Sequence, residues 1–391
     1  MQDNLGNYLS RARRSSDFLK HSIKTTLEDI YFDSKQLILS PGPTQLFQLT
    51  KDAIGSTGWM ANSALKHFLT LSGLLKAPDG IKGDVEAEFI VKKVSKNIPL
   101  DPKRYPPAKI FSALYRELEF SYVHPNHKSR LQCPKIFPTI VLVSGVLNEI
   151  YKTASFERGV QNIGKKNNLK YIVATVSGVK GSDFNSGQLA EQLFEYHKHH
   201  PDEKFWFLTY SKGGIDVLYF LRDHAEWSCK NVVGISTLAT PILGSRHLNK
   251  RYIRMASKLK RDLSEFGRNY LGQELDFFSE AFQRSISTKQ RSWFFKNYHK
   301  LPTNIFYTAL ALSCNWHEGH IYMMLAKLMF PSDTINDGVV DADCAFFPKY
   351  FNAINLGIYH GHHLIAARSS SFSQEALIEA HLILLKYKYL I

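Results

Sequence analysis

One continuous stretch, FWFLTYSKGGIDVLYFL at positions 205–221, shows the order of elements most clearly. Its first six residues are almost all apolar or aromatic, as in a strand buried on both faces of a sheet. From Ile215 onward the apolar residues follow helical spacing. Ser211 stands at the corner between the two patterns, and Gly213 follows two positions later. A serine at such a corner is either an exposed nucleophile or a structural residue at a helix N-terminus.

Strand-like and helix-like segments alternate on both sides of this corner. Strands are predicted at Thr139–Gly145, Lys170–Gly178, Lys204–Tyr210, Asn231–Ala239 and Asn304–Leu312. Helices are predicted at Gln188–His200 and Ile215–Trp227. This alternation predicts an α/β fold with a mostly parallel sheet and right-handed crossovers. Sites in such sheets form at the carboxyl ends of the strands, and Ser211 lies at one of these ends.

The length of 391 residues fits one large domain with insertions, or two domains. We expect residues 1–130 to form a mainly helical N-terminal region of unknown role. Helical spacing is visible there near 15–30, 43–56 and 60–76. Residues 131–391 are expected to form the α/β domain. Within it, 245–300 breaks the alternation and is interpreted as a helical lid insertion over the carboxyl edge of the sheet.

The formal net charge of +14 is compatible with nucleic acid, an anionic membrane surface, or solubility alone. No nucleic-acid-binding motif accompanies the charge, so we expect no nucleic-acid partner. The insertion combines Lys and Arg with large apolar residues, which suits a peripheral contact with an anionic membrane. Its charges are equally compatible with a solvated face. The basic residues that would carry the contact include Arg251, Arg254, Lys258 and Arg261.

No apolar run is long enough for a transmembrane helix, and the N-terminus lacks the apolar run of a secretory signal. We therefore expect a cytoplasmic protein, or one exported without a cleavable signal peptide. The four cysteines lie far apart without CxxC spacing, which predicts reduced thiols. They are Cys133, Cys229, Cys314 and Cys344.

Three motifs follow Ser211 along the chain: TPILGS at 240–245, NDGVVD at 336–341 and HGHHL at 360–364. With the serine corner, they make the chain resemble a lipase-type member of the α/β-hydrolase superfamily over roughly residues 133–370. Such lipases carry a Gly-x-Ser-x-Gly turn, a strand ending in Thr-Pro-x-x-Gly, an acid in Asp-Gly-Val-Val and a histidine before leucine. The resemblance implies a catalytic triad of Ser211, Asp337 and His363, in the superfamily's order.

Neighbouring residues leave alternatives for two of these roles. Other candidate acids and bases are Asp333, Asp341, Asp343, His360 and His362. The histidines could bind a metal instead, but no carboxylate-flanked ligand pattern surrounds them, so we expect no metal. No nucleotide-binding motif is present, so we expect no cofactor.

The resemblance also implies an oxyanion hole made of two backbone N–H groups. The first belongs to Lys212. The second belongs to the loop after the first strand, at Val146 or else Leu147, although this loop is equally an ordinary βα turn. One residue departs from the family pattern, because Thr209 stands where the turn usually has glycine. A larger residue requires the turn to open or shift.

The expected function is that of a serine hydrolase that cleaves carboxylic esters through an acyl-enzyme intermediate. Its substrate would be a lipid or another acyl ester, as in lipases, esterases and phospholipases. One alternative is a hydrolase-fold binding or scaffold protein without turnover, which the Thr209 departure suggests. The other is an acyltransferase that uses the same triad, since the sequence does not distinguish transfer from hydrolysis.

Overall fold

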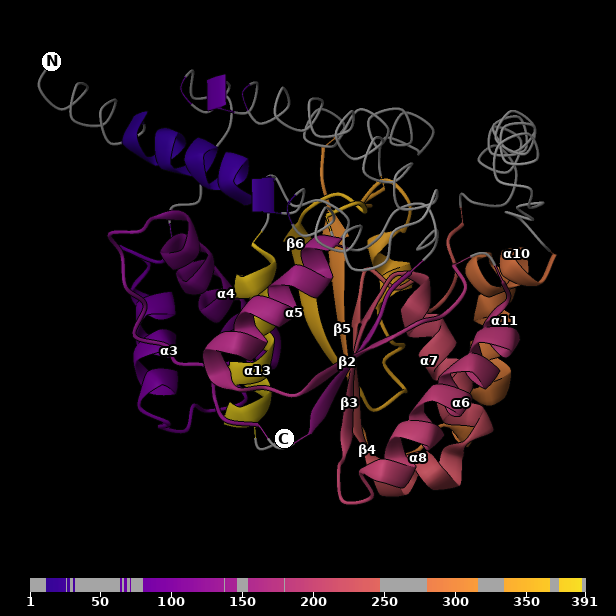
Figure 1. Ribbon diagram of the computed structural model, residues 1–391. Helices are drawn as coiled ribbons and strands as arrows, with labels where there is room; N and C mark the ends of the chain where they lie inside the picture. The colour runs from indigo at the N-terminus through magenta and orange to yellow at the C-terminus, as the bar shows by residue number, and fades with distance from the viewer. Residues whose placement is uncertain are drawn as a thin grey trace, which may run out of the picture. The chain divides into compact units, whose positions relative to one another are not determined.

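The computed structural model describes residues 12–25, 27–28, 31, 64, 67–68, 71, 80–136, 138–145, 154–178, 180–246, 280–315, 334–365 and 373–388. The chain divides into two compact units (Figure 1). The helical unit comprises Met1–Ile136, Ala154–Leu169 and Leu364–Ile391, and the sheet unit comprises Phe137–Thr153 and Lys170–His363. The predicted boundary near residue 130, between a region of unknown role and a hydrolase domain, stays a prediction.

The sheet unit is built on six strands that pair in parallel throughout. They are β1 (Thr139–Val143), β2 (Tyr171–Ala174), β3 (Phe205–Tyr210), β4 (Val232–Leu238), β5 (Phe306–Ser313) and β6 (Ile354–His360), in the order β2-β1-β3-β4-β5-β6. The predicted α/β class with a mostly parallel sheet is confirmed. β1 to β5 correspond to the five predicted strands.

Strands β1 and β3 are buried along their whole length, which explains their nearly continuous apolar sequences. Every residue of β1 and β3 is buried. Val141 of β1 and Phe207 of β3 are register partners and belong to the same hydrophobic core cluster. Strands covered on both faces carry apolar side chains at most positions, and this pattern made them recognisable in the sequence.

The sequence predicts five strands, and the structure adds a sixth. β6 is an edge strand among the described strands, and its burial is interrupted along its length. Its pairing with β5 shifts register between Ala309 and Ala311. Gly357, with φ +108°, lies beside this irregularity. A glycine in a bulged edge strand weakens the sequence pattern, because the residues no longer alternate regularly.

The helices of the sheet unit include the residues that follow Ser211 and the end of the predicted insertion. They are α6 (Ser182–His199), α7 (Lys212–Asp223), α8 (Ala225–Asn231), α10 (Glu280–Ile286) and α11 (Lys289–Asn297), with short 3₁₀ turns η2 (Tyr298–Lys300) and η4 (Ala342–Ala345). The predicted helix at 215–227 is therefore two helices, which meet at His224.

The described part of the insertion, 280–300, is helical as predicted, whereas 247–279 lies outside the described residues. That gap contains Arg251, Arg254, Lys258 and Arg261. α11 is anchored to α7, because Trp293 stacks on Tyr219 with ring centroids 3.9 Å apart. Arg222 covers both rings. The end of the insertion is thus fixed to the helix that follows the serine.

The helical unit contains a helix at 12–25 together with α3 (Val85–Ser95), α4 (Pro107–Val123), α5 (Ala154–Asn167) and α13 (Gln374–Tyr387). α13 packs against α4 and α5 (Figure 1). The described elements before residue 130 are all helical, as predicted. The predicted helix near 43–56 lies outside the described residues, and only four residues of 60–76 are described.

Buried polar groups lie inside the helical unit. Arg158 of α5 forms an ion pair with Glu375 of α13 at 2.7 Å, and both side chains are buried. Burial lowers the pKa of His381 to about 3. Burial also lowers the pKa of His21 to about 4. The helical unit therefore holds two histidines that stay neutral at pH values well below the usual histidine pKa.

Among the described residues, no helix combines the length and apolar character needed to cross a bilayer. All four cysteines are described, and none is in a disulfide. That the thiols are reduced stays a prediction.

Candidate active site

Ser211 occupies a sharp corner between the end of β3 and the start of α7. Its backbone has φ 52° and ψ −130°, a left-handed φ that non-glycine residues rarely adopt. Its N–H donates to the carbonyl of Leu238 at 2.8 Å, and its carbonyl accepts from the N–H of Gly214 at 3.1 Å. Backbone strain of this kind persists where surrounding structure enforces it and clusters at functional sites. The corner therefore presents a held and strained serine.

The structure shows how the corner accommodates Thr209, the residue that departs from the family pattern. A Cβ on Gly214 would lie 2.9 Å from Oγ1 of Thr209 and 2.3 Å from Oγ1 of Thr240. Gly214, the second glycine after the serine, thus leaves room for two buried threonines. Thr209 also donates its hydroxyl to the carbonyl of Ser236 at 3.0 Å, so its polar atom is satisfied. The corner still requires a small residue beside position 209, but that residue is Gly214, which follows the serine.

Gly213, two positions after the serine, is held to glycine by a different contact. A Cβ at this position would lie 2.5 Å from the carbonyl oxygens of both Val143 and Ser144. The end of β1 therefore passes directly against the first turn of α7. Any other residue at 213 would push the turn away from this strand.

Ser211, His363 and Asp337 form a hydrogen-bonded row. Oγ of Ser211 lies 2.8 Å from Nε2 of His363, and Nδ1 of His363 lies 2.7 Å from Oδ2 of Asp337. A carboxylate only accepts hydrogen bonds, so Nδ1 carries the proton and Nε2 is left to accept from the serine hydroxyl. All three side chains are buried. This arrangement gives the serine a base and gives the base an orienting acid.

Asp337 is held by its own turn. Oδ1 accepts from the N–H groups of Val339 and Val340 at 2.9 and 2.8 Å, which leaves Oδ2 for the histidine. Gly338 makes the turn possible with φ +97°. The N–H of His363 also donates to the carbonyl of Asp337 at 2.9 Å. The NDGVVD motif therefore fixes the direction of the carboxylate and its distance from the histidine.

The alternative acids and bases have other positions. Asp343 is exposed and pairs with Arg246, and Asp341 pairs with Asn336 across an isolated antiparallel bridge. Asp333 lies outside the described residues. His360 is exposed at the end of β6, and His362 is buried. Among these histidines, the one whose Nε2 lies at hydrogen-bonding distance from Oγ of Ser211 is His363.

Of the two predicted oxyanion donors, one lies among the described residues and the other does not. Lys212 is the first residue of α7, where backbone N–H groups have no partner within the helix. Val146 and its alternative Leu147 lie outside the described residues. Gly145, just before them, borders the serine, because a Cβ there would lie 3.2 Å from Oγ of Ser211. The loop after β1 therefore starts beside the serine, and the identity of its donor stays a prediction.

Sequence reasoning missed two residues that contact this row or its neighbours. Tyr210 donates its hydroxyl to the carbonyl of His363. Asp216 binds the side chain of Lys212. Helical spacing pairs Lys212 with Asp216, so that contact was accessible from the sequence. Nothing local predicts the contact between Tyr210 and His363. No group of metal-ligating side chains suited to an ion occurs in the described part of the chain.

No protein-family model matches the chain, and no curated protein sequence matches it. Solved structures do match. The metagenomic carboxyl esterase MGS0156 is 21% identical over 67% of this chain and 80% of its own, with a TM-score of 0.50. At this identity the likeness shows a shared fold.

The matches to two further solved structures extend over most of the length of those proteins. The mature lipase BlEst2 of Bacillus licheniformis is 23% identical over 61% of this chain and 89% of its own, with a TM-score of 0.45. The RedJ thioesterase of the prodiginine pathway in Streptomyces coelicolor is 12% identical over 68% of this chain and 98% of its own, with a TM-score of 0.34.

Proposed function

We propose that this chain, whose fold is that of the α/β-hydrolase superfamily, is a serine hydrolase that cleaves carboxylic esters. One observation carries the proposal: the hydrogen-bonded row of Ser211, His363 and Asp337 behind a strained corner. A structural serine at a helix N-terminus would cap the helix with its side chain, yet Ser211 makes no such capping bond. Its hydroxyl faces an imidazole instead.

In the first half-reaction, Oγ of Ser211 attacks the acyl carbonyl carbon while its proton passes to Nε2 of His363. Asp337 stabilises the imidazolium that forms. The π electrons of the carbonyl bond move onto its oxygen, which becomes an oxyanion. The N–H groups of Lys212 and Val146 are the proposed hydrogen-bond donors to this oxyanion. When the tetrahedral intermediate collapses, the ester C–O bond breaks. His363 returns its proton to the leaving alcohol, and the acyl group stays on Ser211.

In the second half-reaction, water attacks the acyl-enzyme and gives one proton to His363. The second intermediate collapses to a carboxylic acid, and the proton returns to Ser211. If an alcohol attacked the acyl-enzyme in place of water, the product would be a new ester, and the reaction would be an acyl transfer. No cofactor or metal enters either half-reaction.

The substrate class that we propose is a lipid or another acyl ester, met at an anionic membrane surface. The helix at 12–25, continued by the helical residues 27, 28 and 31, supports this proposal. It exposes Ile23, Leu27 and Tyr31, which are spaced by four and so lie on one face. The opposite face, with Ser15, Ser22 and Thr25, is buried and mostly polar.

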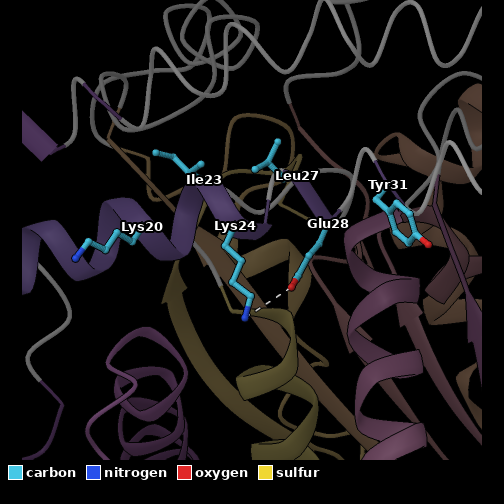
Figure 2. Close-up of a pocket in the computed structure, with 6 residues that line it drawn as sticks. All are labelled: Lys20, Ile23, Lys24, Leu27, Glu28 and Tyr31. Atoms are coloured by element: carbon cyan, nitrogen blue, oxygen red, sulfur yellow. Dashed lines mark ion pairs between the residues drawn. The ribbon is translucent and has the colours of Figure 1, made fainter.

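The exposed apolar residues of this helix line an open hollow of about 460 Å³ together with Lys20, Lys24 and Glu28 (Figure 2). An exposed apolar face bordered by lysines matches the two parts of a membrane surface. The acyl region takes apolar side chains, and anionic headgroups attract the ammonium groups.

Vesicle sedimentation tests this contact. The variant Ile23→Ser/Leu27→Ser should bind vesicles of anionic phospholipid roughly tenfold more weakly, since each side chain loses buried apolar area. A matched control is Val85→Ser, which alters an exposed apolar residue on α3. Equal binding to neutral and anionic vesicles, or equal loss in the control, would contradict the proposed membrane contact.

Hydrolysis of a short-chain ester tests the proposed function itself. The wild-type protein should release acid and alcohol, and Ser211→Ala should reduce kcat by several orders of magnitude, as in other triads, without unfolding the protein. Adding a soluble alcohol distinguishes hydrolysis from transfer, because a transferase forms the new ester in preference to the acid. Absence of any Ser211-dependent turnover over an ester panel would favour the scaffold alternative.

A further inference from the structure

A buried ion pair lies directly beside the serine. Lys212, the residue after Ser211, is fully buried, and its Nζ donates to both carboxylate oxygens of Asp216 at 2.7 and 2.9 Å. Asp216 is 1% exposed. The two residues are four apart in α7, so their side chains share one face of the helix. The side chains of this pair take no part in the hydrogen bonds of the proposed triad.

The carboxylate of Asp216 is also held from α6. Ser182 donates its hydroxyl to Oδ1 at 2.5 Å, and Asn185 donates its amide to Oδ2 at 2.7 Å. Asp216 therefore accepts four hydrogen bonds. The N–H of Ser182 in turn donates to Oγ of Ser285 in α10, at 3.0 Å. A continuous chain of buried bonds thus runs from α10, in the predicted insertion, to the residue that follows the serine.

This pair is an unfavourable way to stabilise a helix. The N-terminus of a helix carries partial positive charge, so an ammonium in the first turn is disfavoured. Removing two charges from water costs free energy that their attraction does not always offset, and well-packed apolar residues often do as well. Lys212 lies in a sheet-unit core where apolar residues predominate. Its presence there indicates a requirement other than stability.

We infer that Lys212 and Asp216 are positioning residues for the proposed oxyanion donor. With its ammonium held at two points, the side chain of Lys212 fixes the backbone of that residue. The N–H of Lys212 then keeps one direction relative to Oγ of Ser211. Oxyanion stabilisation depends on donors that are oriented before the reaction. This role rests on the proposed function, because it concerns the same N–H group.

A purely structural link between α6 and α7 predicts a different result. Loss of a link would lower the melting temperature and leave turnover per folded molecule unchanged. Loss of positioning would lower kcat and leave KM nearly unchanged, because the oxyanion exists only in the transition state and intermediates. The split between kcat and KM therefore separates the two roles.

The key variant is Lys212→Met/Asp216→Asn, which removes both charges and leaves no unpaired buried ion. The amide introduced at position 216 can still bond to both α6 residues, because a serine hydroxyl donates or accepts. We expect kcat on a short-chain ester to fall about tenfold or more, KM to stay within about threefold, and the melting temperature to change by about 5 °C or less. The single variant Lys212→Met should be less stable than the double variant, because it strands a buried carboxylate.

The matched control is Arg158→Met/Glu375→Gln, which neutralises a buried ion pair of similar length in the helical unit. This control should leave kcat within about twofold of wild type, because the pair lies outside the proposed oxyanion hole. A Lys212→Met/Asp216→Asn protein with wild-type kcat would overturn the inference, as would an equal kcat loss in the control.

Hydrogen exchange provides a readout that does not need turnover. Amides of residues 211–215 should exchange faster in the double variant than in the wild type, and unchanged exchange would also overturn the inference. If the wild-type protein has no Ser211-dependent turnover, the proposed function fails. The exchange comparison still decides in that case whether the pair holds the backbone.

Discussion

Tyr210 donates its phenolic hydroxyl to the backbone carbonyl of His363. The residue just before the serine thus holds the peptide of the histidine that the serine contacts. From the other side, the N–H of His363 donates to the carbonyl of Asp337 at 2.9 Å. The row of three side chains is therefore fixed through the backbone of its middle member as well as through its own hydrogen bonds.

Removing this hydroxyl tests how much the backbone link contributes. Tyr210→Phe keeps the ring, which lies 5.7 Å from the imidazole between centroids. One intramolecular hydrogen bond contributes about 0.5–1.5 kcal/mol, so kcat should fall about two- to tenfold while KM is unchanged. Steady-state kinetics on a short-chain ester measures the change. A Tyr210→Phe protein with unaltered kcat would show that the other bonds suffice.

The members of the row should act as one unit. We expect His363→Ala and Asp337→Asn each to reduce kcat by roughly three orders of magnitude or more, and the double variant to be little worse than His363→Ala alone. His362→Ala is the matched control from the same loop and should stay active. If His362→Ala is inactive and His363→Ala is active, the assignment of the base is wrong.

Gly214 should be intolerant of even one added methyl group. Gly214→Ala places a Cβ 2.3 Å from Oγ1 of Thr240, and such overpacking costs about 1–3 kcal/mol. The double variant Gly214→Ala/Thr240→Ala should recover part of this loss. Gly187→Ala is the control, because a Cβ there meets nothing within 4 Å. Urea unfolding midpoints measure the differences, and equal midpoints for the two alanine variants would refute this steric account.

Stability should decrease as the pH falls below about 6.5, the unfolded histidine pKa. The folded pKa of His381 is lowered to about 3 by burial, so the unfolded chain binds the proton first. Between these two pKa values, each pH unit removes up to about 1.4 kcal/mol of unfolding free energy. His381→Gln should therefore show a smaller fall in melting temperature from pH 7 to pH 5. An identical fall in variant and wild type would exclude this histidine as a cause.

Local sequence patterns predicted the sheet well where burial is continuous and poorly where it is not. β1 and β3 are buried at every position and apolar or aromatic at nearly every one, so they were recognisable. β6 was missed, because Gly357 and a register shift break its alternation. α3 and α4 were also not named, although both carry buried apolar residues at helical spacing. The resemblance to the α/β-hydrolase superfamily is confirmed at the level of the fold alone.

The sequence placed Ser211 at the carboxyl end of a strand, and the resemblance supplied its two partners, but neither gave distances. Motif order indicated Ser211, Asp337 and His363, and the structure brings their side chains within hydrogen-bonding distance. Accommodation of Thr209 could not be predicted, because it depends on Gly214 and on a threonine from the next strand's loop. Long-range contacts of this kind carry no local sequence signal.

The most direct test of the central claim is covalent labelling by a fluorophosphonate probe, which reacts with an activated serine and not with an ordinary one. The account predicts one label per molecule of native protein, located on Ser211 by peptide mass mapping and abolished in Ser211→Ala and in unfolded protein. A native wild-type protein that takes up no label, or a Ser211→Ala protein that is labelled as fast as wild type, would contradict it.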